Sequence, residues 1–273
     1  MKNEERVMKI KITAIVLSVL GIVTLAGCAA ATTNTSSEAA AAKEETLFQA
    51  STINSLLAGN YDGFMTFGEL KQHGDVGIGT FNALDGELVM IDNTVYKVKA
   101  SGAVEEVPDT DTTPFAAVTY FDEDATKSLG PTASLEALEQ ELDKMITDPK
   151  AFYVFRIDGT FNTIKARSVP SQIKPYPVLS EAVKNQSIFD YQKISGTLVG
   201  LWCPADIGGL NVKGYHFHFI ADDRSKGGHL LDVSFDSATA FVDQTDGFFM
   251  TLSPSTPEGT VTDADSAIDA VEK

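Results

Sequence analysis

Cysteine is scarce in this sequence: Cys28 and Cys203 are the only two among 273 residues. Two cysteines exclude a small scaffold held together by several disulfides, and a chain of this length can bury a core without them. Basic residues are also few, with 21 Lys and Arg against 38 Asp and Glu and a net charge of −17. Such an acidic surface repels phosphate backbones, so we expect no nucleic-acid partner.

Several signatures of common enzyme classes are missing. The chain has no GxSxG, P-loop, CxxC or HExxH pattern. The GIG sequence at 77–79 is only a fragment of a dinucleotide-binding motif and is too weak to support such a site. Apolar residues make up 43% and charged residues 22%, which excludes a wholly disordered or collagen-like chain. The sequence therefore predicts a folded protein.

No apolar run reaches the roughly 20 residues that span a bilayer, but a shorter one, Ile12 to Leu25, follows a basic start. It ends in LAGC (25–28), which resembles the lipobox of bacterial lipoproteins, where the cysteine becomes the lipidated first residue. This pattern predicts a lipoprotein signal peptide over 1–27, lipidation of Cys28 and an extracytoplasmic protein anchored to the membrane only through its lipid. The alternatives are a plain signal peptide or an anchor helix with an accidental cysteine.

The remaining composition predicts an α+β fold with two sheet-based domains and helices packed on one side. Residues 28–45 are small and polar, which predicts a flexible tether. A stretch with three prolines at 169–178 marks the predicted boundary between an N-terminal α+β domain (46–170) and a C-terminal β-rich domain (171–252). The acidic tail at 253–273 has few apolar residues, so composition predicts that it is disordered or lies across the surface.

Local patterns predict individual elements. Apolar residues at helical spacing predict a helix over 47–57. Asp92 and Asn93 separate two apolar runs, which predicts a hairpin with a two-residue turn. Leucines at helical spacing predict a second helix that begins near Ser134.

Histidine is also rare, yet three of the four histidines lie between 216 and 229. His216 and His218 alternate with aromatic residues in a predicted strand, so both imidazoles point to one face. A glycine-ended turn at 222–228 brings His229 back on a neighbouring antiparallel strand. Three converging imidazoles predict a metal site with open positions, which suits zinc at about 2.0–2.1 Å per bond. Copper, nickel and iron also accept imidazole, and a solvated strand face is the alternative without a metal.

The spacing leaves the chemistry of this metal open. A metal with open positions acts as a Lewis acid or as a source of hydroxide. Hydroxide would favour hydrolysis or hydration. A Lewis acid would favour stabilising an enolate, as in the decarboxylation of a 3-oxo acid.

Eight short motifs follow one another through the folded part of the chain. They are GIGTFN (77–82), LDGEL (84–88), FRIDGTF (155–161), KPYP (174–177), GTLVG (196–200), GYHFHF (214–219), DDR (222–224) and GGH (227–229). In this order they resemble the α-acetolactate decarboxylases of bacteria, from about residue 46 to the C-terminus. The leader and the tether are additions to that enzyme module.

The resemblance implies a zinc enzyme that converts 2-acetolactate to acetoin and carbon dioxide. It also implies a homodimer and a C-terminal tail that returns to the active site. The implied site residues are the zinc ligands His216, His218 and His229 and the catalytic residues Arg167, Glu87 and Glu272.

These residues suggest a hypothesis for the reaction. Loss of carbon dioxide leaves an enediolate whose charge the zinc takes up, so no organic cofactor is needed. Arg167 would hold the carboxylate or the enediolate, and Glu87 or Glu272 would deliver a proton. One alternative is another three-histidine metalloenzyme that acts on a small oxo acid or ester by metal-bound hydroxide. A non-catalytic metal-binding lipoprotein is the other.

Overall fold

The structure is a computed structural model that describes residues 45–255, 266–268 and 271. The predicted signal peptide (1–27), Cys28 and Glu272 lie outside the described residues, as does all of the predicted tether except Glu45. Among the described residues, no helix combines the length and apolar character needed to cross a bilayer.

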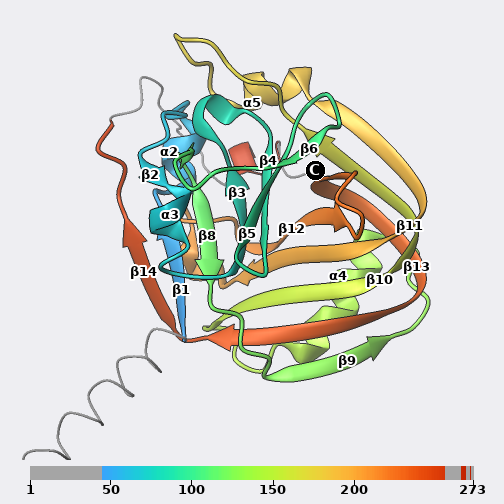
Figure 1. Ribbon diagram of the computed structural model, residues 1–273. Helices are drawn as coiled ribbons and strands as arrows, with labels where there is room; N and C mark the ends of the chain where they lie inside the picture. Colours follow the sequence, from blue (N-terminus) through green and yellow to red (C-terminus); the bar gives the residue numbers. More distant parts are fainter. Residues whose placement is uncertain (1–44, 256–265, 269–270, 272–273) are drawn as a thin grey trace, which may run out of the picture. The chain divides into compact units, whose positions relative to one another are not determined.

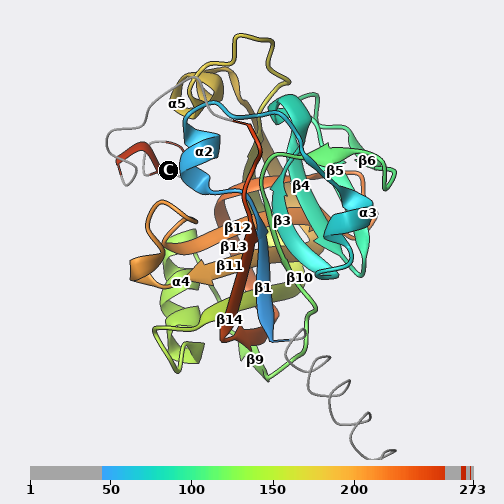
Figure 2. The same ribbon diagram turned by 90° about the vertical axis from the view of Figure 1, so that its left-hand side faces the viewer.

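The first sheet has seven strands in the order β14-β1-β8-β3-β4-β5-β6. Their bounds are β1 Thr46–Ala50, β3 Val76–Thr80, β4 Glu87–Ile91, β5 Thr94–Val98, β6 Val104–Glu106, β8 Ala116–Thr119 and β14 Gly247–Thr251. Neighbouring strands are antiparallel except β1 and β14, which run parallel. Strand β14 therefore comes from far along the chain to lie beside β1 at the edge of the sheet (Figure 1, Figure 2).

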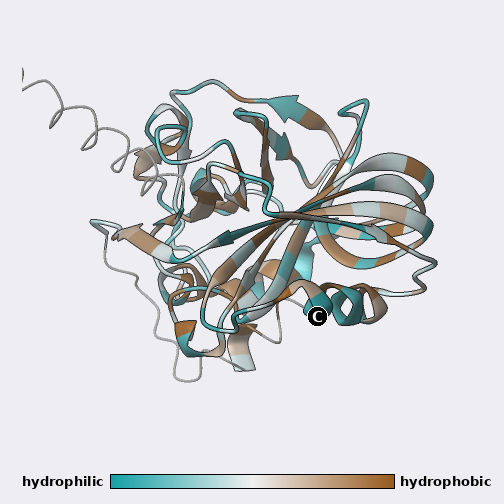
Figure 3. Ribbon diagram, turned by 90° about the horizontal axis from the view of Figure 1, so that it is seen from below, coloured by the Kyte–Doolittle hydropathy of each residue, from teal (hydrophilic) through white to brown (hydrophobic). Residues whose placement is uncertain are grey.

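The second sheet has five antiparallel strands in the order β10-β11-β12-β13-β9, and β13 also pairs with β10. Their bounds are β9 Ala125–Leu129, β10 Phe152–Ser168, β11 Ser187–Cys203, β12 Gly214–Ala221 and β13 Gly227–Thr245. Apolar segments recur along these long, curved strands (Figure 3). Because β9 and β10 belong to this sheet, the second sheet begins before residue 170. The division into two domains at that residue stays a prediction.

Helices and turns connect these strands. The helices are α2 Ile53–Leu57, α3 Phe67–Leu70, α4 Leu135–Leu142 and α5 Leu179–Ala182, with 3₁₀ turns η1 Asn82–Leu84, η2 Asp143–Met145, η3 Val183–Asn185 and η4 Ala205–Ile207. A small separate pair of strands consists of β2 Met65–Thr66 and β7 Thr112–Thr113. Strands dominate, and helices add to them, in agreement with the predicted α+β class.

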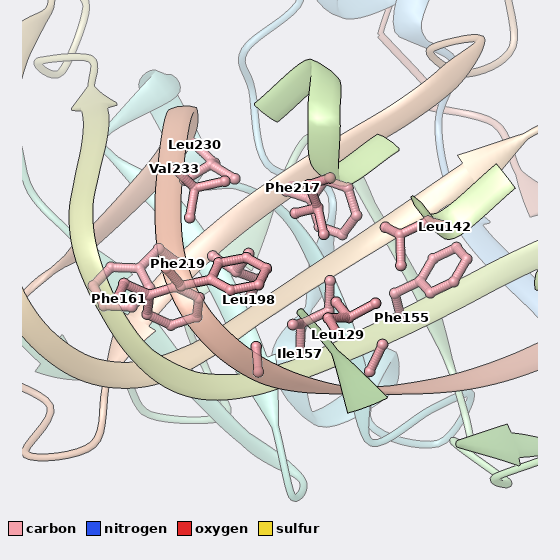
Figure 4. Close-up of a cluster of buried hydrophobic side chains, with 14 of the residues drawn as sticks. Leu129, Leu142, Phe155, Ile157, Phe161, Leu198, Phe217, Phe219, Leu230 and Val233 are labelled. Carbon is pink, nitrogen blue, oxygen red and sulfur yellow. The ribbon is translucent and has the colours of Figure 1, made fainter. Parts of the chain in front are cut away.

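The two sheets pack face to face through an apolar layer. Val89 of the first sheet and Val199 of the second belong to the same buried cluster. The other face of the second sheet is covered by α4, whose Leu138 and Leu142 join the aromatic core drawn in Figure 4. The other face of the first sheet buries residues of α3. Each sheet therefore carries a helix on one face and its partner sheet on the other.

Two local predictions are confirmed and one is wrong. Ser134 caps α4, because its side chain accepts a hydrogen bond from the Ala137 backbone N–H. Asp92 and Asn93 form the predicted turn with φ of 50° and 61°. The predicted helix over 47–57 is instead strand β1 followed by α2. Strand β1 is almost wholly buried between β14 and β8, and those pairings override its helical spacing.

Candidate metal centre and active site

Three histidines meet where strands β12 and β13 pair. His216 and His218 lie two residues apart on β12, so their side chains share a face of the strand. His229 lies near the start of β13, directly opposite His218. The ring centroids are 4.8–5.3 Å apart, and one nitrogen from each ring lies within 4.8 Å of the other two. The structure therefore brings the three histidines together.

Two glycines before His229 allow this close pairing. Gly228 has a φ of +141°, and a Cβ there would lie 2.6 Å from the Arg167 carbonyl oxygen. A Cβ on Gly227 would lie 2.7 Å from the Phe219 carbonyl oxygen. Only residues without side chains let β13 approach β10 and β12 at this point, where His229 pairs with both Arg167 and His218.

Hydrogen bonding sets the orientation of His218. Its Nδ1 lies 2.7 Å from the carbonyl oxygen of Leu88. A carbonyl only accepts, so Nδ1 carries the proton and Nε2 keeps its lone pair. Within the described residues, that buried Nε2 makes no hydrogen bond. His218 belongs to the second sheet but is held by a hydrogen bond to the first sheet, and its Nε2 is left ready to bind a metal.

Burial keeps all three imidazoles neutral. Burial, together with the nearby charge of Arg167, lowers the pKa of His216 to about 3. Burial also lowers the pKa of His218 and of His229 well below the usual range, with contributions from neighbouring positive groups. Neutral imidazoles are the form that binds metals, because no proton competes for the lone pair.

The spacing of the nitrogens also fits a metal ion. His216 Nε2 and His229 Nδ1 lie 3.1 Å apart. Two nitrogens bound to one tetrahedral zinc at 2.0–2.1 Å would be about 3.3 Å apart. Three neutral histidine ligands suit zinc and other transition metals and suit calcium or magnesium poorly. These residues therefore form a candidate site for a transition metal.

A carboxylate and a guanidinium flank the histidines. Glu87 begins β4, and Arg167 is the penultimate residue of β10. Arg167 Nη1 lies 3.5 Å from Glu87 Oε1, and Glu87 Oε2 lies 3.6 Å from His218 Nε2. Both residues are buried: Arg167 is 5% exposed and Glu87 is 7% exposed. The predicted pair thus comes from two different sheets to one place.

These groups line a small pocket with an open volume of about 40 Å³. Its polar lining consists of Thr80, Glu87, Arg167, His216, His218 and His229, and its apolar lining includes Ile53, Leu56, Leu84, Phe115, Val169 and Leu179. The Thr80 hydroxyl donates to the Gly86 carbonyl at 2.8 Å, which ties the segment before Glu87 to β3. The lining of the pocket therefore combines charged and polar groups with apolar side chains.

The described end of the chain reaches the same site. The Val271 carbonyl oxygen accepts a hydrogen bond from Arg167 Nη2 at 2.8 Å. Ile268 and Val271 are buried in the apolar cluster formed around α2 and α5, and Figure 2 draws this segment in red beside α2. Composition predicted a tail outside the core, and these two residues correct that prediction. Glu272, the third implied catalytic residue, lies outside the described residues.

Sequence reasoning missed parts of this site. The carbonyls of Leu88 and Val271 are backbone groups, which no side-chain pattern identifies. The apolar wall comes from five separate segments between residues 53 and 179. Among these apolar residues, only Leu84 could have been linked to the site from the sequence, because it lies in the LDGEL motif that includes Glu87.

Comparisons with known proteins identify the family of this chain. The family model described as alpha-acetolactate decarboxylase matches residues 47–258. The alpha-acetolactate decarboxylase of Methanosarcina mazei is 46% identical over 211 residues, which cover 77% of this chain and 73% of the relative. That of Bacillus licheniformis is 42% identical over 200 residues, which cover 73% of this chain and 79% of the relative.

A solved structure has the same fold. The crystal structure of alpha-acetolactate decarboxylase from Bacillus subtilis strain 168 matches with a TM-score of 0.80 and 36% identity, covering 83% of this chain and 99% of that one. The buried polar pocket between two sheets therefore belongs to an enzyme, and its class is that of the carboxy-lyases. The chain belongs to the alpha-acetolactate decarboxylase family.

Proposed function

We propose that this protein catalyses the zinc-dependent decarboxylation of 2-acetolactate to acetoin and carbon dioxide. The observation that carries the proposal is the meeting of three neutral histidines, Arg167 and Glu87 in one buried pocket of a chain from this family. Bound zinc would supply a Lewis acid for the negative charge that develops on the substrate oxygens.

The substrate is a 3-oxo acid with a carboxylate on C1, a hydroxyl on C2 and a ketone on C3. The bond between C1 and C2 breaks, carbon dioxide leaves, and the electron pair spreads over C2 and C3 as an enediolate. A proton then adds to carbon and gives acetoin. The protein must therefore hold a carboxylate, stabilise a developing anion and deliver one proton.

Arg167 is suited to the first of these tasks. Its guanidinium is buried against Glu87 and the Val271 carbonyl, so its direction is fixed before substrate arrives. Donors held in place in a buried site stabilise an anion more strongly than mobile donors in water do. We propose that Arg167 binds the substrate carboxylate and then steadies the enediolate.

Glu87 is the candidate proton donor within the described residues. Its carboxylate lies between Arg167 and His218, at 3.5 and 3.6 Å. Glu272 is the other candidate, and the position of Val271 beside Arg167 supports the return of this segment to the site. Two carboxylates in one pocket would repel, which favours keeping one of them protonated at neutral pH.

We also propose that the enzyme is extracytoplasmic and lipid-anchored through Cys28. The support is the LAGC sequence directly after the apolar run. Mass spectrometry of the protein purified from bacterial membranes tests this. We expect a lipid-modified Cys28 at the new N-terminus and release of the Cys28→Ala variant from the membrane. An intact leader or an unmodified cysteine would contradict the proposal.

A homodimer is the proposed assembly, and the edge of the first sheet supports it. Strand β14 is uncharged, and Phe249 on it is 57% exposed. The opposite edge, β6, carries Glu105 and Glu106, which discourage pairing. Sedimentation of wild type and Phe249→Glu tests this edge. We expect a dimer that the substitution converts to monomers, and a monomeric wild type would contradict the proposal.

Acetoin formation tests the central proposal. Purified residues 29–273 are incubated with racemic 2-acetolactate, with and without a chelator, and then with zinc added back. We expect acetoin above the spontaneous background, its loss with the chelator and its recovery with zinc. Zinc binding without acetoin would instead indicate a binding protein, and hydrolysis of another oxo acid or ester would indicate a metal-hydroxide enzyme.

A further inference from the structure

The apolar side of the pocket has one member whose backbone is unusual. Ala83 and Leu84 are consecutive residues with φ of 60° and 58°. This left-handed conformation is uncommon for residues other than glycine and costs roughly 1–3 kcal/mol where the surroundings impose it. Leu84 is only 4% exposed and lines the pocket, whereas Ala83 does not.

The surrounding chain holds this conformation in place. The Ala83 N–H donates to the Tyr61 carbonyl at 2.8 Å, and the Gln172 N–H donates to the Ala83 carbonyl at 2.8 Å. The Leu84 N–H donates to the Phe81 carbonyl at 2.9 Å. Segments from both sides thus fix the turn, and the result is a leucine side chain directed into the pocket rather than away from it.

The position of this side chain matters because the open space is small. Only about 40 Å³ of the pocket is open, so a small acid bound there must lie in close contact with the lining side chains. When the oxygens of a small acid lie against Arg167 and the histidines, its alkyl groups must lie against the wall. Leu84 lies three residues before Glu87, the proposed proton donor, and both residues line this pocket.

We infer that Leu84 is a specificity-determining residue that limits the size of the alkyl group on C2 of the substrate. This inference rests on the proposed function, since it assumes a 2-hydroxy-3-oxo acid as substrate. The strained turn at 83–84 then has a purpose. It holds the branched side chain of Leu84 in the pocket, where it limits the size of the substrate, whereas a relaxed turn would direct that side chain elsewhere.

A matched pair of variants tests the inference. Leu84→Gly removes the side chain, and glycine adopts a φ near 58° without strain. Ala83→Gly relaxes the neighbouring residue equally but leaves the pocket lining unchanged. The zinc-loaded proteins are assayed with 2-acetolactate and with the analogue that carries ethyl in place of the C2 methyl, and the ratio of kcat/KM values is compared.

We expect Leu84→Gly to raise the ratio of ethyl to methyl substrate at least about tenfold, because one methylene in an apolar pocket changes discrimination by about 10- to 200-fold. Ala83→Gly should leave the ratio at the wild-type value. Leu84→Ala serves as a second enlarging variant if glycine loosens the turn. An unchanged ratio in both enlarging variants, with both substrates affected equally, would overturn the inference. Wild type that turns over neither substrate would instead refute the proposed function.

Discussion

Strand β12 has two buried faces with opposite uses. One face carries His216 and His218, and the other carries Phe217 and Phe219. Burial does not distinguish them, since His218 is 1% exposed and Phe219 is fully buried. Their partners do: the phenylalanines pack among the apolar side chains of one buried cluster (Figure 4), whereas His218 meets a carbonyl and a carboxylate from the other sheet.

The difference shows how one strand can serve structure and chemistry together. Alternation assigns odd positions to the aromatic core and even positions to the pocket. The aromatic face anchors the strand, because the Phe217 ring lies over Gly200, where a Cβ would come within 2.0 Å of it. A strand held this firmly on one face can keep polar groups in fixed positions on the other. Substitutions on the two faces should therefore have different effects.

His218→Ala should have the largest effect on activity and a small one on folding. Removing one of three ligands should weaken zinc binding more than about 100-fold, since even loss of an outer-shell partner costs about 10- to 100-fold. Decarboxylation should fall with it. Zinc content after dialysis, acetoin formation and circular dichroism measure the three quantities. Full zinc occupancy with normal turnover would show that these histidines are not the metal site.

Arg167→Ala should separate binding of the metal from catalysis. The guanidinium contacts Glu87 and the chain end but is not a ligand, so zinc content should stay near wild type. Turnover should fall by about 10²- to 10³-fold, the usual effect of losing one fixed donor to a developing anion. Steady-state kinetics and metal analysis on the same sample test this. Normal turnover, or loss of the metal, would contradict the proposed role.

The histidine face was predictable, while its partners were not. His216, His218 and His229 lie in one local hairpin, so alternation and a glycine-ended turn were enough to bring them together. Glu87 and Arg167 are separated by 80 residues and belong to different sheets, and only the resemblance to a family suggested them. The same limit explains why the helix predicted over 47–57 is wrong. Strand β1, which forms there instead, pairs with β14, and β14 lies about 200 residues further along the chain.

Phe219→Ala should show the opposite pattern to His218→Ala. The Phe219 ring lies edge-on to Phe161, with centroids 5.7 Å apart, in the core of the second sheet. Truncating a buried phenylalanine leaves a cavity and costs about 3–5 kcal/mol of unfolding free energy. Urea denaturation measures this loss, and zinc content per folded molecule should be unchanged. A stability loss below about 1 kcal/mol would mean that this face does not anchor the strand.

Asp243 on β13 is a buried residue that differs from both the histidines and the phenylalanines of β12. It is 1% exposed, as His218 is, but its neighbours include the acidic residues Asp124, Glu45 and Asp122. Burial, and then the charges of these acids, raise its pKa to about 8, although the Asp122 N–H donates to its Oδ2 at 3.3 Å. In the histidine pocket, the guanidinium of Arg167 lies beside the carboxyl group of Glu87. At Asp243, the surroundings favour the neutral acid.

Asp243→Asn should therefore stabilise the fold at neutral pH. In the unfolded chain Asp243 ionises near pH 3.9, but in the fold it stays protonated up to about pH 8. Below pH 4 both states hold the proton, so burial of this group has no ionisation cost. The cost grows as pH rises from 4 to 8 and is constant above that. Asparagine is neutral throughout, so the variant should match wild type at pH 4 and gain stability over it as the pH rises to 8. Thermal unfolding across this range tests the trend. A variant that is less stable at pH 8 would mean that the carboxylate is ionised and favourably bound at this site.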